Sequence, residues 1–378
     1  MSRTPRHIAA SLLAVLLLIL SASAFAGNGP IAEPEALGPW AVGRTTFFVV
    51  DPDRDGRALQ VDVWYPVDAG DASGPASVYD LIFAGIESDV ALDEPPVSAQ
   101  GPFPMVVFSH GNNGVRFQSY FLTEHLASHG MIVVAPDHSG NTAFDLLFPG
   151  TPFEARDRPL DVSLVITRML ERSIDFADPF FDRVDPLRIG VTGHSFGGFT
   201  SLAMLTGFQD VAPDPRVSAI MPISPASSGF SDEDLAEIMD PMLVLGGTSD
   251  ITTPIDPQSV RPFELASSRP RYRVDVEDAG HGSFTNICDF YAALSPFVPP
   301  FLLEILLGNF EEGCVPELIP IDEAHRISNF YATAFFNREL VGDPRYKRYL
   351  TPGRVRKEGL PVQFFSVNGG GNAGALTN

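Results

Sequence analysis

The sequence predicts an α/β fold built on a mostly parallel sheet with helices on both faces. Two observations predict it: segments typical of strands alternate with segments typical of helices, and the strand segments are continuous apolar runs. The 378 residues, 44% of them hydrophobic, are sufficient for a large core. We expect buried strands at 105–108, 131–135, 189–191, 219–223, 242–245 and 272–276. We expect helices at 117–129, 159–172, 198–205, 258–266 and 321–340.

The N-terminus predicts a secretory signal peptide at residues 1–26. Arg3 and Arg6 precede an apolar run at 8–20, and small residues with an A-x-A pattern follow, so we expect cleavage after Ala26. An uncleaved membrane anchor is the alternative, but the run is short for a membrane span. We therefore expect a secreted or periplasmic protein with no stable membrane span after removal of the signal.

Beyond the signal peptide, the sequence predicts a single domain at 27–345. The residues that follow, 346–378, predict a C-terminal tail with a mobile end, because the last residues are rich in Gly and Asn. Residues 67–104 are rich in Pro, Gly, Ala and Ser and predict a surface excursion.

The charge of the chain excludes one class of partner. The formal net charge is −22, and removal of Arg3 and Arg6 with the signal peptide makes it −24. Such a surface repels nucleic acid and anionic membranes and keeps an exported protein soluble. We therefore expect no nucleic-acid partner.

Residues 45–66 predict a hairpin that supplies antiparallel strands at the edge of the sheet. Its two apolar strands are joined by a turn rich in Asp and Gly. Four aspartates and a glycine also match the spacing of a calcium loop, but strands instead of helices flank them and an Asp occupies the twelfth position. We prefer a plain turn for this set, which comprises Asp51, Asp53, Asp55, Gly56 and Asp62.

The stretch RIGVTGHSFGG, residues 188–198, contains the G-x-S-x-G pattern between an expected strand and an expected helix. The turn is so tight that it has no room for a Cβ on either side of the serine, and glycines therefore occupy positions 193 and 197. Ser195 is thereby lifted from the sheet at a helix N-terminus, which predicts a nucleophile. An ordinary Gly-rich turn is the alternative reading of this stretch taken alone.

Two further strand ends carry groups that would complete a catalytic triad. Asp250 follows the strand at 242–245, and His281 follows the strand at 272–276. The order Ser, Asp, His is the one expected with a nucleophile elbow. Ser195 would attack, His281 would move its proton, and Asp250 would fix the imidazole tautomer. Taken alone, Asp250 could also be a helix N-cap and His281 a loop histidine.

The backbone N–H groups of Asn112 and Phe196 are the expected oxyanion-hole donors. Asn112 lies in the turn after the first core strand, and Phe196 directly follows the nucleophile. Three phenylalanines near these loops, Phe117, Phe121 and Phe284, are candidate residues of a substrate pocket, although core packing is the alternative for each.

An apolar insert at about 287–320 follows His281 and predicts a small helical, lid-like segment. The chain has two cysteines, Cys288 and Cys314, and in an oxidising compartment we expect them to form one disulfide. Two free buried thiols are the alternative. We expect no metal and no cofactor: His125 and His129 lie four residues apart on an expected helix, but no third ligand is near in sequence.

Several stretches make the chain resemble the α/β-hydrolase superfamily over residues 40–285. They are FSHGNNG (108–114), LTEHLASHGMIVVAPDHSGN (122–141), RPLDVSLVI (158–166), GHSFGG (193–198), GTSDITTP (247–254) and GHGSF (280–284). More narrowly, the chain resembles secreted dienelactone-hydrolase-like and platelet-activating-factor-acetylhydrolase-like serine esterases, near the cutinase-like polyesterases.

The resemblance implies an α/β-hydrolase fold, and its departures narrow the activity that we expect. Dienelactone hydrolases use a cysteine where this chain has Ser195, so dienelactone opening is not expected. The acetylhydrolases place the acid after the strand that follows the nucleophile strand, where this chain has no Asp; Asp250 therefore implies the cutinase-like arrangement. The large insert argues against an open polymer-binding cleft.

These observations together predict an exported serine hydrolase that cleaves carboxylic esters with short, medium or lipid-like acyl groups through an acyl-enzyme intermediate. A serine peptidase or amidase on the same fold is the alternative enzyme. A catalytically silent surface-binding module is the alternative outside enzymes.

Overall fold

The computed structural model describes residues 31–148, 150–308, 310–368 and 374–375. The predicted signal peptide lies outside the described residues. The chain divides into two units, Met1–Ile31 and Ala32–Asn378, and everything described below belongs to the second.

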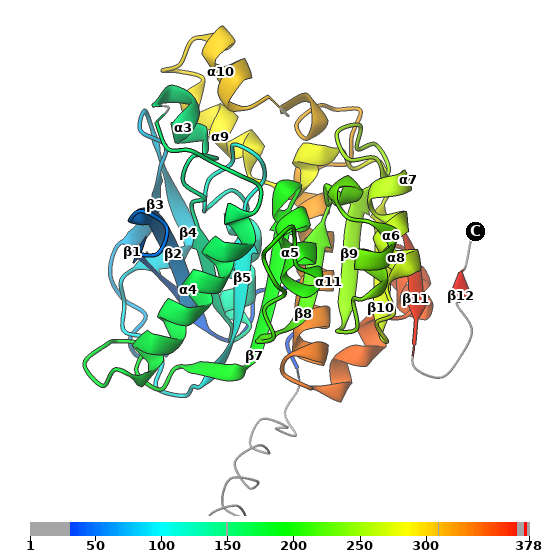
Figure 1. The fold of residues 1–378 in the computed structure, drawn as a ribbon, viewed down its shortest axis with the longest axis horizontal. Helices are drawn as coiled ribbons and strands as arrows, with labels where there is room; N and C mark the ends of the chain where they lie inside the picture. The colour runs from blue at the N-terminus through cyan, green and yellow to red at the C-terminus, as the bar shows by residue number, and fades with distance from the viewer. Residues whose placement is uncertain (1–30, 149, 309, 369–373, 376–378) are drawn as a thin grey trace, which may run out of the picture. The chain divides into compact units, whose positions relative to one another are not determined.

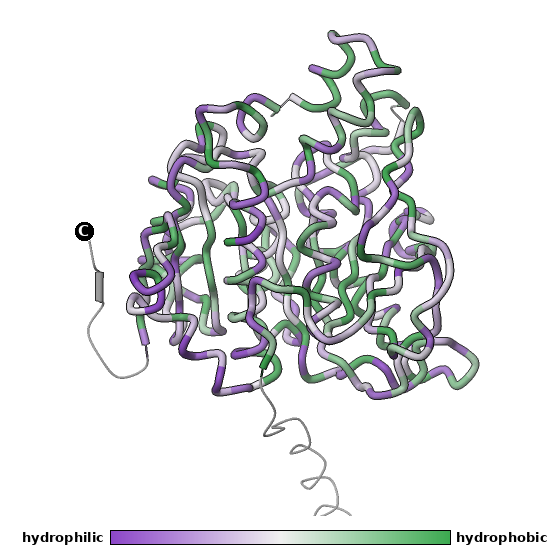
Figure 2. The backbone as a smooth tube through the Cα atoms, turned by 180° about the vertical axis from the view of Figure 1, so that it is seen from behind, coloured by the Kyte–Doolittle hydropathy of each residue, from purple (hydrophilic) through white to green (hydrophobic). Residues whose placement is uncertain are grey.

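A single mixed sheet forms the centre of this unit (Figure 1), as predicted. In the described residues its order is β12-β11-β10-β9-β8-β7-β5-β6-β2-β1-β4-β3. Neighbouring strands from β10 to β6 are parallel. They are β5 (Phe103–Ser109), β6 (Ile132–Pro136), β7 (Val184–His194), β8 (Val217–Ile223), β9 (Met242–Gly247) and β10 (Arg271–Val276). Their residues are mostly buried. Figure 2 colours the backbone by hydropathy, and hydrophobic segments run through the interior of this unit.

Antiparallel strands extend the sheet beyond β6. The predicted hairpin is present as β1 (Ala41–Asp51) and β2 (Arg57–Val67), and β2 pairs with β6. The excursion expected at 67–104 contains two strands that the sequence did not indicate, β3 (Ala76–Asp80) and β4 (Gly85–Asp93). β4 pairs with β1 through residues about 50 positions apart in the chain, such as Val42 and Ala91. The composition of this segment does not reveal such long-range pairing.

The opposite edge contains residues that the sequence assigned to a tail. After α12 (Pro352–Glu358), β11 (Val362–Val367) pairs antiparallel with β10, and β12 (Gly374–Ala375) pairs with β11. In β11, Val362, Phe364 and Val367 are buried. The chain after residue 345 therefore contributes to the sheet as far as these strands.

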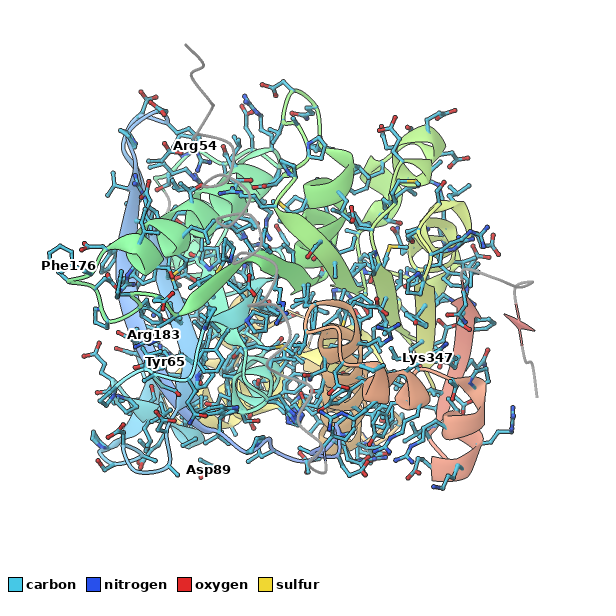
Figure 3. The ribbon with its side chains drawn as sticks, turned by 90° about the horizontal axis from the view of Figure 1, so that it is seen from below. Arg54, Tyr65, Asp89, Phe176, Arg183 and Lys347 are labelled. Atoms are coloured by element: carbon cyan, nitrogen blue, oxygen red, sulfur yellow. A yellow bond between two sulfur atoms is a disulfide. The ribbon has the colours of Figure 1, made fainter. Side chains whose placement is uncertain are left out.

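Helices cover both faces of the sheet. Figure 3 views the sheet from one end, with α4 on one side and α11 on the other. α4 packs with α5, and α11 packs with α2. The same view shows Phe176 and Arg183, which lie in the connection between α4 and β7, at the end where β7 begins. The helices are α2 (Tyr120–Ser128), α3 (Ala143–Leu147), α4 (Asp157–Ile174), α5 (Phe196–Thr206), α6 (Asp232–Ala236), α7 (Ile255–Gln258), α8 (Val260–Leu265), α9 (Ile287–Leu294), α10 (Pro300–Leu306) and α11 (Ile321–Glu339).

The helices of the insert, α9 and α10, lie beside α3 at the end of the sheet where the parallel strands finish (Figure 1). In open α/β sheets this end is where loops from several strands meet and where ligands bind. None of the helices in the described residues has the length and hydropathy that a membrane span requires.

The hairpin turn that matched a calcium spacing is held by arginines. Asp51 accepts a hydrogen bond from Arg54 at 2.6 Å. Asp62, the twelfth residue of that spacing, is fully buried between Arg44 and Arg116. Since its carboxylate already pairs with two guanidinium groups, the plain turn describes this segment.

Candidate active site

Ser195 lies on a sharp turn between β7 and α5. Its φ of 60° is uncommon for a residue with a side chain, and such strain is concentrated at functional sites. The flanking glycines are required by contact: a Cβ on Gly197 would lie 1.7 Å from the carbonyl oxygen of Ser109, and one on Gly193 would lie 2.4 Å from it. The close approach of β5 to the turn therefore excludes any side chain at these two positions and presents Ser195 above the sheet.

His281 and Asp250 form a buried pair at the ends of neighbouring strands. Asp250 follows β9 and His281 follows β10, and Nδ1 of the imidazole lies 2.9 Å from Oδ2 of the carboxylate. The imidazole is fully buried, and its Nε2 has no hydrogen-bond partner among the described residues. An unpaired ring nitrogen beside a cavity is available to accept a proton from a nucleophile.

Thr253 fixes the carboxylate from the other side. Its backbone N–H donates to Asp250 Oδ1 at 2.6 Å, and its Oγ1 lies 2.9 Å from Oδ2. Burial by itself would raise the pKa of Asp250. The hydrogen bond and charge of His281 and the N–H of Thr253 outweigh it, so the pKa lies below its usual value. Asp250 is therefore an anion that fixes the orientation of the imidazole.

His194, directly before Ser195, connects the histidine loop to the turn after β5. Its Nε2 donates to the backbone oxygen of His281 at 2.8 Å, and its Nδ1 accepts from the Gln118 side chain at 3.0 Å. The oxygen of Gln118 in turn accepts the N–H of Gly111 at 2.9 Å. Burial, with the charge of His281, lowers the pKa of His194 to about 3, so its ring is neutral at pH 7. Neither His194 nor Gln118 was predicted from the sequence to belong to the site.

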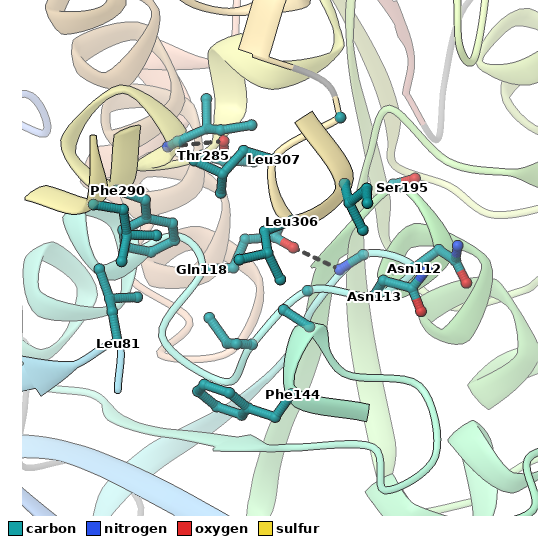
Figure 4. A pocket seen from close by; sticks show the side chains of 18 of the residues that line it. Leu81, Asn112, Asn113, Gln118, Phe144, Ser195, Thr285, Phe290, Leu306 and Leu307 are labelled. Atoms are coloured by element: carbon teal, nitrogen blue, oxygen red, sulfur yellow. Dashed lines mark hydrogen bonds between the residues drawn. The ribbon is translucent and has the colours of Figure 1, made fainter. Parts of the chain in front are cut away.

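The turn at 110–114, which carries Asn112, lies against Ser195. A Cβ on Gly111 would be 3.4 Å from Cβ of Ser195. Asn112 and Ser195 line the same cavity, and Figure 4 shows them on the same side of it. Phe196 is the first residue of α5, where N–H groups have no partner within the helix. Both predicted oxyanion donors therefore belong to segments next to Ser195.

The cavity has a volume of about 360 Å³ and is lined mainly by apolar side chains. Figure 4 shows Leu81 and Phe290 opposite Ser195 and Leu306 between them. Ser195 and His281 both line this cavity, together with residues of the insert, of α3 and of the β3–β4 turn. A concave apolar site with a few convergent polar groups is typical of a small-molecule pocket.

The three phenylalanines proposed for the pocket do not line this cavity. Phe117 is fully buried and packs edge-on against Phe290. Phe121 stacks on His325 of α11, with ring centroids 3.6 Å apart, and Phe284 is fully buried near His194. Core packing therefore accounts for all three. The aromatic lining is supplied by the insert, which the sequence placed after His281, and by α3 and the β3–β4 turn, which the sequence did not indicate.

The expected disulfide between Cys288 and Cys314 is present. It joins α9 to the part of the insert that follows the short 3-10 helix Phe310–Glu312. Since α9 also supplies Ile287, Phe290 and Leu294 to the cavity wall, the disulfide constrains one wall of the cavity.

The two histidines at 125 and 129 bind backbone oxygens. His125 in α2 and His129 directly after it hydrogen-bond through Nε2 to the backbone oxygens of Pro34 and Ala36, so they anchor the chain before β1. Throughout the described residues, no group of three or more His, Cys, Asp or Glu side chains is placed to hold a metal ion.

A second Ser–His–Asp series lies behind the nucleophile turn. Ser109 Oγ is 2.9 Å from His138 Nε2, and His138 Nδ1 is 3.0 Å from Asp161 Oδ2. All three side chains are fully buried, so no substrate can reach Ser109. This series is part of the polar core below the site, and only the series that includes His281 borders the cavity.

Comparison with known proteins agrees with this geometry. Residues 94–294, just over half of the chain, match the family model described as PETase, PET hydrolase-like. Cutinase est1 of Thermobifida alba is 29% identical over 250 residues, which cover 66% of this chain and 64% of the relative. Cutinase 2 of Thermobifida cellulosilytica is 24% identical over 248 residues, covering 66% and 72%. Chlorophyllase type 0 of Chenopodium album is 26% identical over 139 residues, covering 35% and 37%.

The match thus spans less than two thirds of the length of the first of these cutinases. The family match contains the turn with Ser195, the turn after β5, Asp250 and His281, and it ends at the last residue of α9. The sheet order, the nucleophile turn and the family match agree, and the chain belongs to the PET hydrolase-like family.

Proposed function

We propose that the protein is an exported serine hydrolase that cleaves carboxylic esters with Ser195, His281 and Asp250 as its catalytic triad. One observation carries the proposal: the buried His281–Asp250 pair leaves Nε2 of the imidazole unpaired beside the cavity that Ser195 also lines. Export is proposed from the signal-peptide pattern of the first 26 residues.

The reaction would proceed in two halves. His281 Nε2 takes the proton of Ser195 Oγ while the oxygen attacks the ester carbonyl carbon, and the resulting oxyanion accepts hydrogen bonds from the N–H groups of Asn112 and Phe196. The C–O bond to the alcohol breaks as His281 returns the proton to the leaving oxygen, which leaves an acyl-enzyme. Water then loses a proton to His281 and attacks the acyl carbon, the bond from that carbon to Ser195 Oγ breaks, and His281 returns the proton to Oγ as the acid departs.

The cavity favours esters with an apolar chain. Its wall opposite Ser195 is aliphatic and aromatic, and burying an apolar chain there contributes about 0.8 kcal/mol for each methylene removed from water. The cutinase and chlorophyllase names of the relatives support ester hydrolysis as the reaction class. Because the insert covers one side of the cavity, we propose small or lipid-like esters as substrates.

The test is turnover of p-nitrophenyl esters of increasing acyl length, with and without detergent micelles. We expect Ser195→Ala to abolish turnover and labelling by a fluorophosphonate, whereas Ser228→Ala, at an exposed serine, leaves both unchanged. Normal turnover by the Ser195→Ala variant would exclude the proposed nucleophile. Equal rates on an ester and its amide analogue would favour a peptidase or amidase, and failure of the unmodified protein to label would favour a silent binding module.

A further inference from the structure

A buried arginine that the proposed reaction does not use holds the turn after β5. Arg158 lies in the first turn of α4 and is fully buried. Its Nη1 donates to the backbone oxygen of His110 at 2.6 Å, and its Nη2 donates to the backbone oxygen of Gly111 at 3.0 Å. One guanidinium thus binds two successive carbonyl groups, which lie 48 and 47 positions before Arg158 in the chain. A planar fork of donors suits such a task better than the single charge of a lysine.

The remaining donors of Arg158 are also occupied by the site. Nε and Nη2 donate to Asn141 Oδ1 at 3.1 and 2.7 Å, and the Asn141 amide donates to Asn112 Oδ1 at 2.8 Å. The guanidinium carbon lies 4.5 Å from the ring centroid of Phe196. Arg158 therefore contacts both segments that carry the proposed oxyanion donors, directly or through one side chain.

The direction of the Gly111 carbonyl fixes the direction of the Asn112 N–H, because both belong to one planar peptide unit. The bond between Gly111 and Asn112 is trans, because the cis bonds of the described residues all precede proline. In a trans peptide unit the C=O and the N–H point in opposite directions. The Gly111 oxygen is also bound by His110 Nδ1 at 2.7 Å and by the N–H of Gly114 at 3.1 Å, so it is fixed on the arginine side. The N–H of Asn112 consequently points away from Arg158.

We propose that Arg158 is a positioning residue that holds the Gly111 carbonyl so that the N–H of Asn112 faces the oxyanion formed at Ser195. The inference rests on the proposed function, since it assigns a role within that reaction. Ser195 borders the same turn: a Cβ on Gly111 would lie 3.4 Å from Ser195 Cβ, and Asn112 and Ser195 line the same cavity. Arg158 itself touches no substrate.

The experiment compares Arg158→Met and Arg158→Lys with the unmodified protein on p-nitrophenyl butyrate. Loss of one oxyanion donor typically lowers kcat by about 10²- to 10³-fold, and we expect Arg158→Met to fall in this range with KM changed by less than about threefold. Arg158→Lys should recover a small part of kcat, because one ammonium cannot bind both carbonyls in the same plane. Guanidinium ion added at millimolar concentration should raise the kcat of Arg158→Met.

A transition-state readout separates this role from a structural one. Binding of butylboronic acid, which forms a tetrahedral anion on the serine, should weaken in parallel with kcat, whereas binding of an uncharged ketone analogue should change by less than about threefold. A kcat within threefold of the unmodified value would overturn the proposal, as would a raised KM with normal kcat. Equal weakening of both inhibitors would also overturn it.

Arg273→Met is the matched control. Arg273 is a nearly buried arginine stacked on Phe365 at 3.9 Å, on β10 near the edge of the sheet, so its loss tests the general effect of removing a buried guanidinium. We expect Arg273→Met to lower the melting temperature with kcat nearly unchanged. Should Arg158→Met fail to fold, Arg158→Lys, which keeps a charge but cannot bind both carbonyl groups, should still show most of the fall in kcat at unchanged KM, and a normal kcat of this variant would refute the role.

The two proposals fail in different ways. If Ser195→Ala retains turnover, the proposed function is wrong. If Ser195→Ala is inactive while Arg158→Met keeps a normal kcat, the function stands and the positioning role of Arg158 is wrong.

Discussion

The Cys288–Cys314 disulfide offers a quantitative test of how the insert contributes to stability and selectivity. The cysteines are 26 positions apart, and closing a loop of that length in the unfolded chain removes entropy worth about 3.5 kcal/mol at 25 °C. We therefore expect the double variant Cys288→Ala/Cys314→Ala to lose about that amount. Both cysteines are only half-buried, so the truncation itself leaves little cavity.

The corresponding change in melting temperature follows from the size of the unit. An unfolding entropy of about 2.1 cal/mol/K per residue gives about 0.7 kcal/mol/K for some 350 residues, so the melting temperature should fall by about 5 °C. Differential scanning calorimetry measures this shift. Treatment with a reductant should lower the melting temperature of the unmodified protein by the same amount and leave the double variant unchanged.

Activity provides the second readout of the same variant. Since α9 supplies Ile287, Phe290 and Leu294 to the cavity, its release should raise KM for long-chain esters more than for acetate esters, while kcat for acetate remains within about twofold. A melting temperature within 1 °C of the unmodified value would refute the entropy argument. An unchanged chain-length profile would show that the disulfide does not hold the cavity wall.

Two further predictions concern buried polar groups. Replacing Asp62 by Leu leaves the guanidinium groups of Arg44 and Arg116 buried with fewer partners, so the free energy of unfolding should fall by about 3–5 kcal/mol in urea titrations. Asp62→Asn should lower it by less. A loss below about 1 kcal/mol for Asp62→Leu would contradict this expectation. Burial lowers the pKa of His125 to about 3, so this group contributes stability that is present above about pH 6.5 and is lost as the pH falls toward 3. His125→Gln can still donate a hydrogen bond to the backbone oxygen of Pro34. Near pH 5 this variant should show a smaller slope of unfolding free energy against pH, by up to about 1.4 kcal/mol per pH unit. An unchanged slope would show that His125 does not take up a proton on unfolding.

The central sheet could be predicted because its signals are local. A run such as Met242–Leu245 is short, apolar without interruption and bounded by Pro and Gly, which is typical of a strand covered on both faces. The hairpin of β1 and β2 has its turn residues between its strands, and the disulfide had a single possible pairing. In each case the residues that decide the structure are adjacent in the sequence or are the only candidates.

The missed elements depend on partners far away in the chain. β4 exists through pairing with β1, and β11 through pairing with β10 about 90 positions earlier. The cavity wall combines Leu81, Phe144 and Phe290 from three separate segments, of which the sequence indicated only the insert that carries Phe290. Phe117 and Phe121 lie close to the site in sequence, but their side chains pack against Phe290 and His325 and away from the cavity.

The same distinction explains why the sequence suggested the reacting groups and not the groups that hold them. A nucleophile turn needs its own glycines at fixed offsets, so Ser195 carries a local pattern. Arg158 acts on carbonyl groups 47 and 48 positions away, and backbone atoms leave no pattern in sequence. The stretch RPLD at 158–161, which also supplies Asp161 to His138, was the available signal for this polar core.

The hydrogen bonds around the site also indicate which histidine can act as a base. His110 donates through Nδ1 to Gly111 and accepts the N–H of His138 through Nε2, and His138 is bound at both nitrogens by Asp161 and Ser109. His194 likewise has both nitrogens occupied. A ring with both nitrogens engaged in the core must break a hydrogen bond before it can accept a proton, and a buried bond that is lost leaves an unsatisfied group. Of these four histidines only His281 pairs one nitrogen with a carboxylate and leaves the other unpaired beside the cavity, which is the arrangement that general-base catalysis requires.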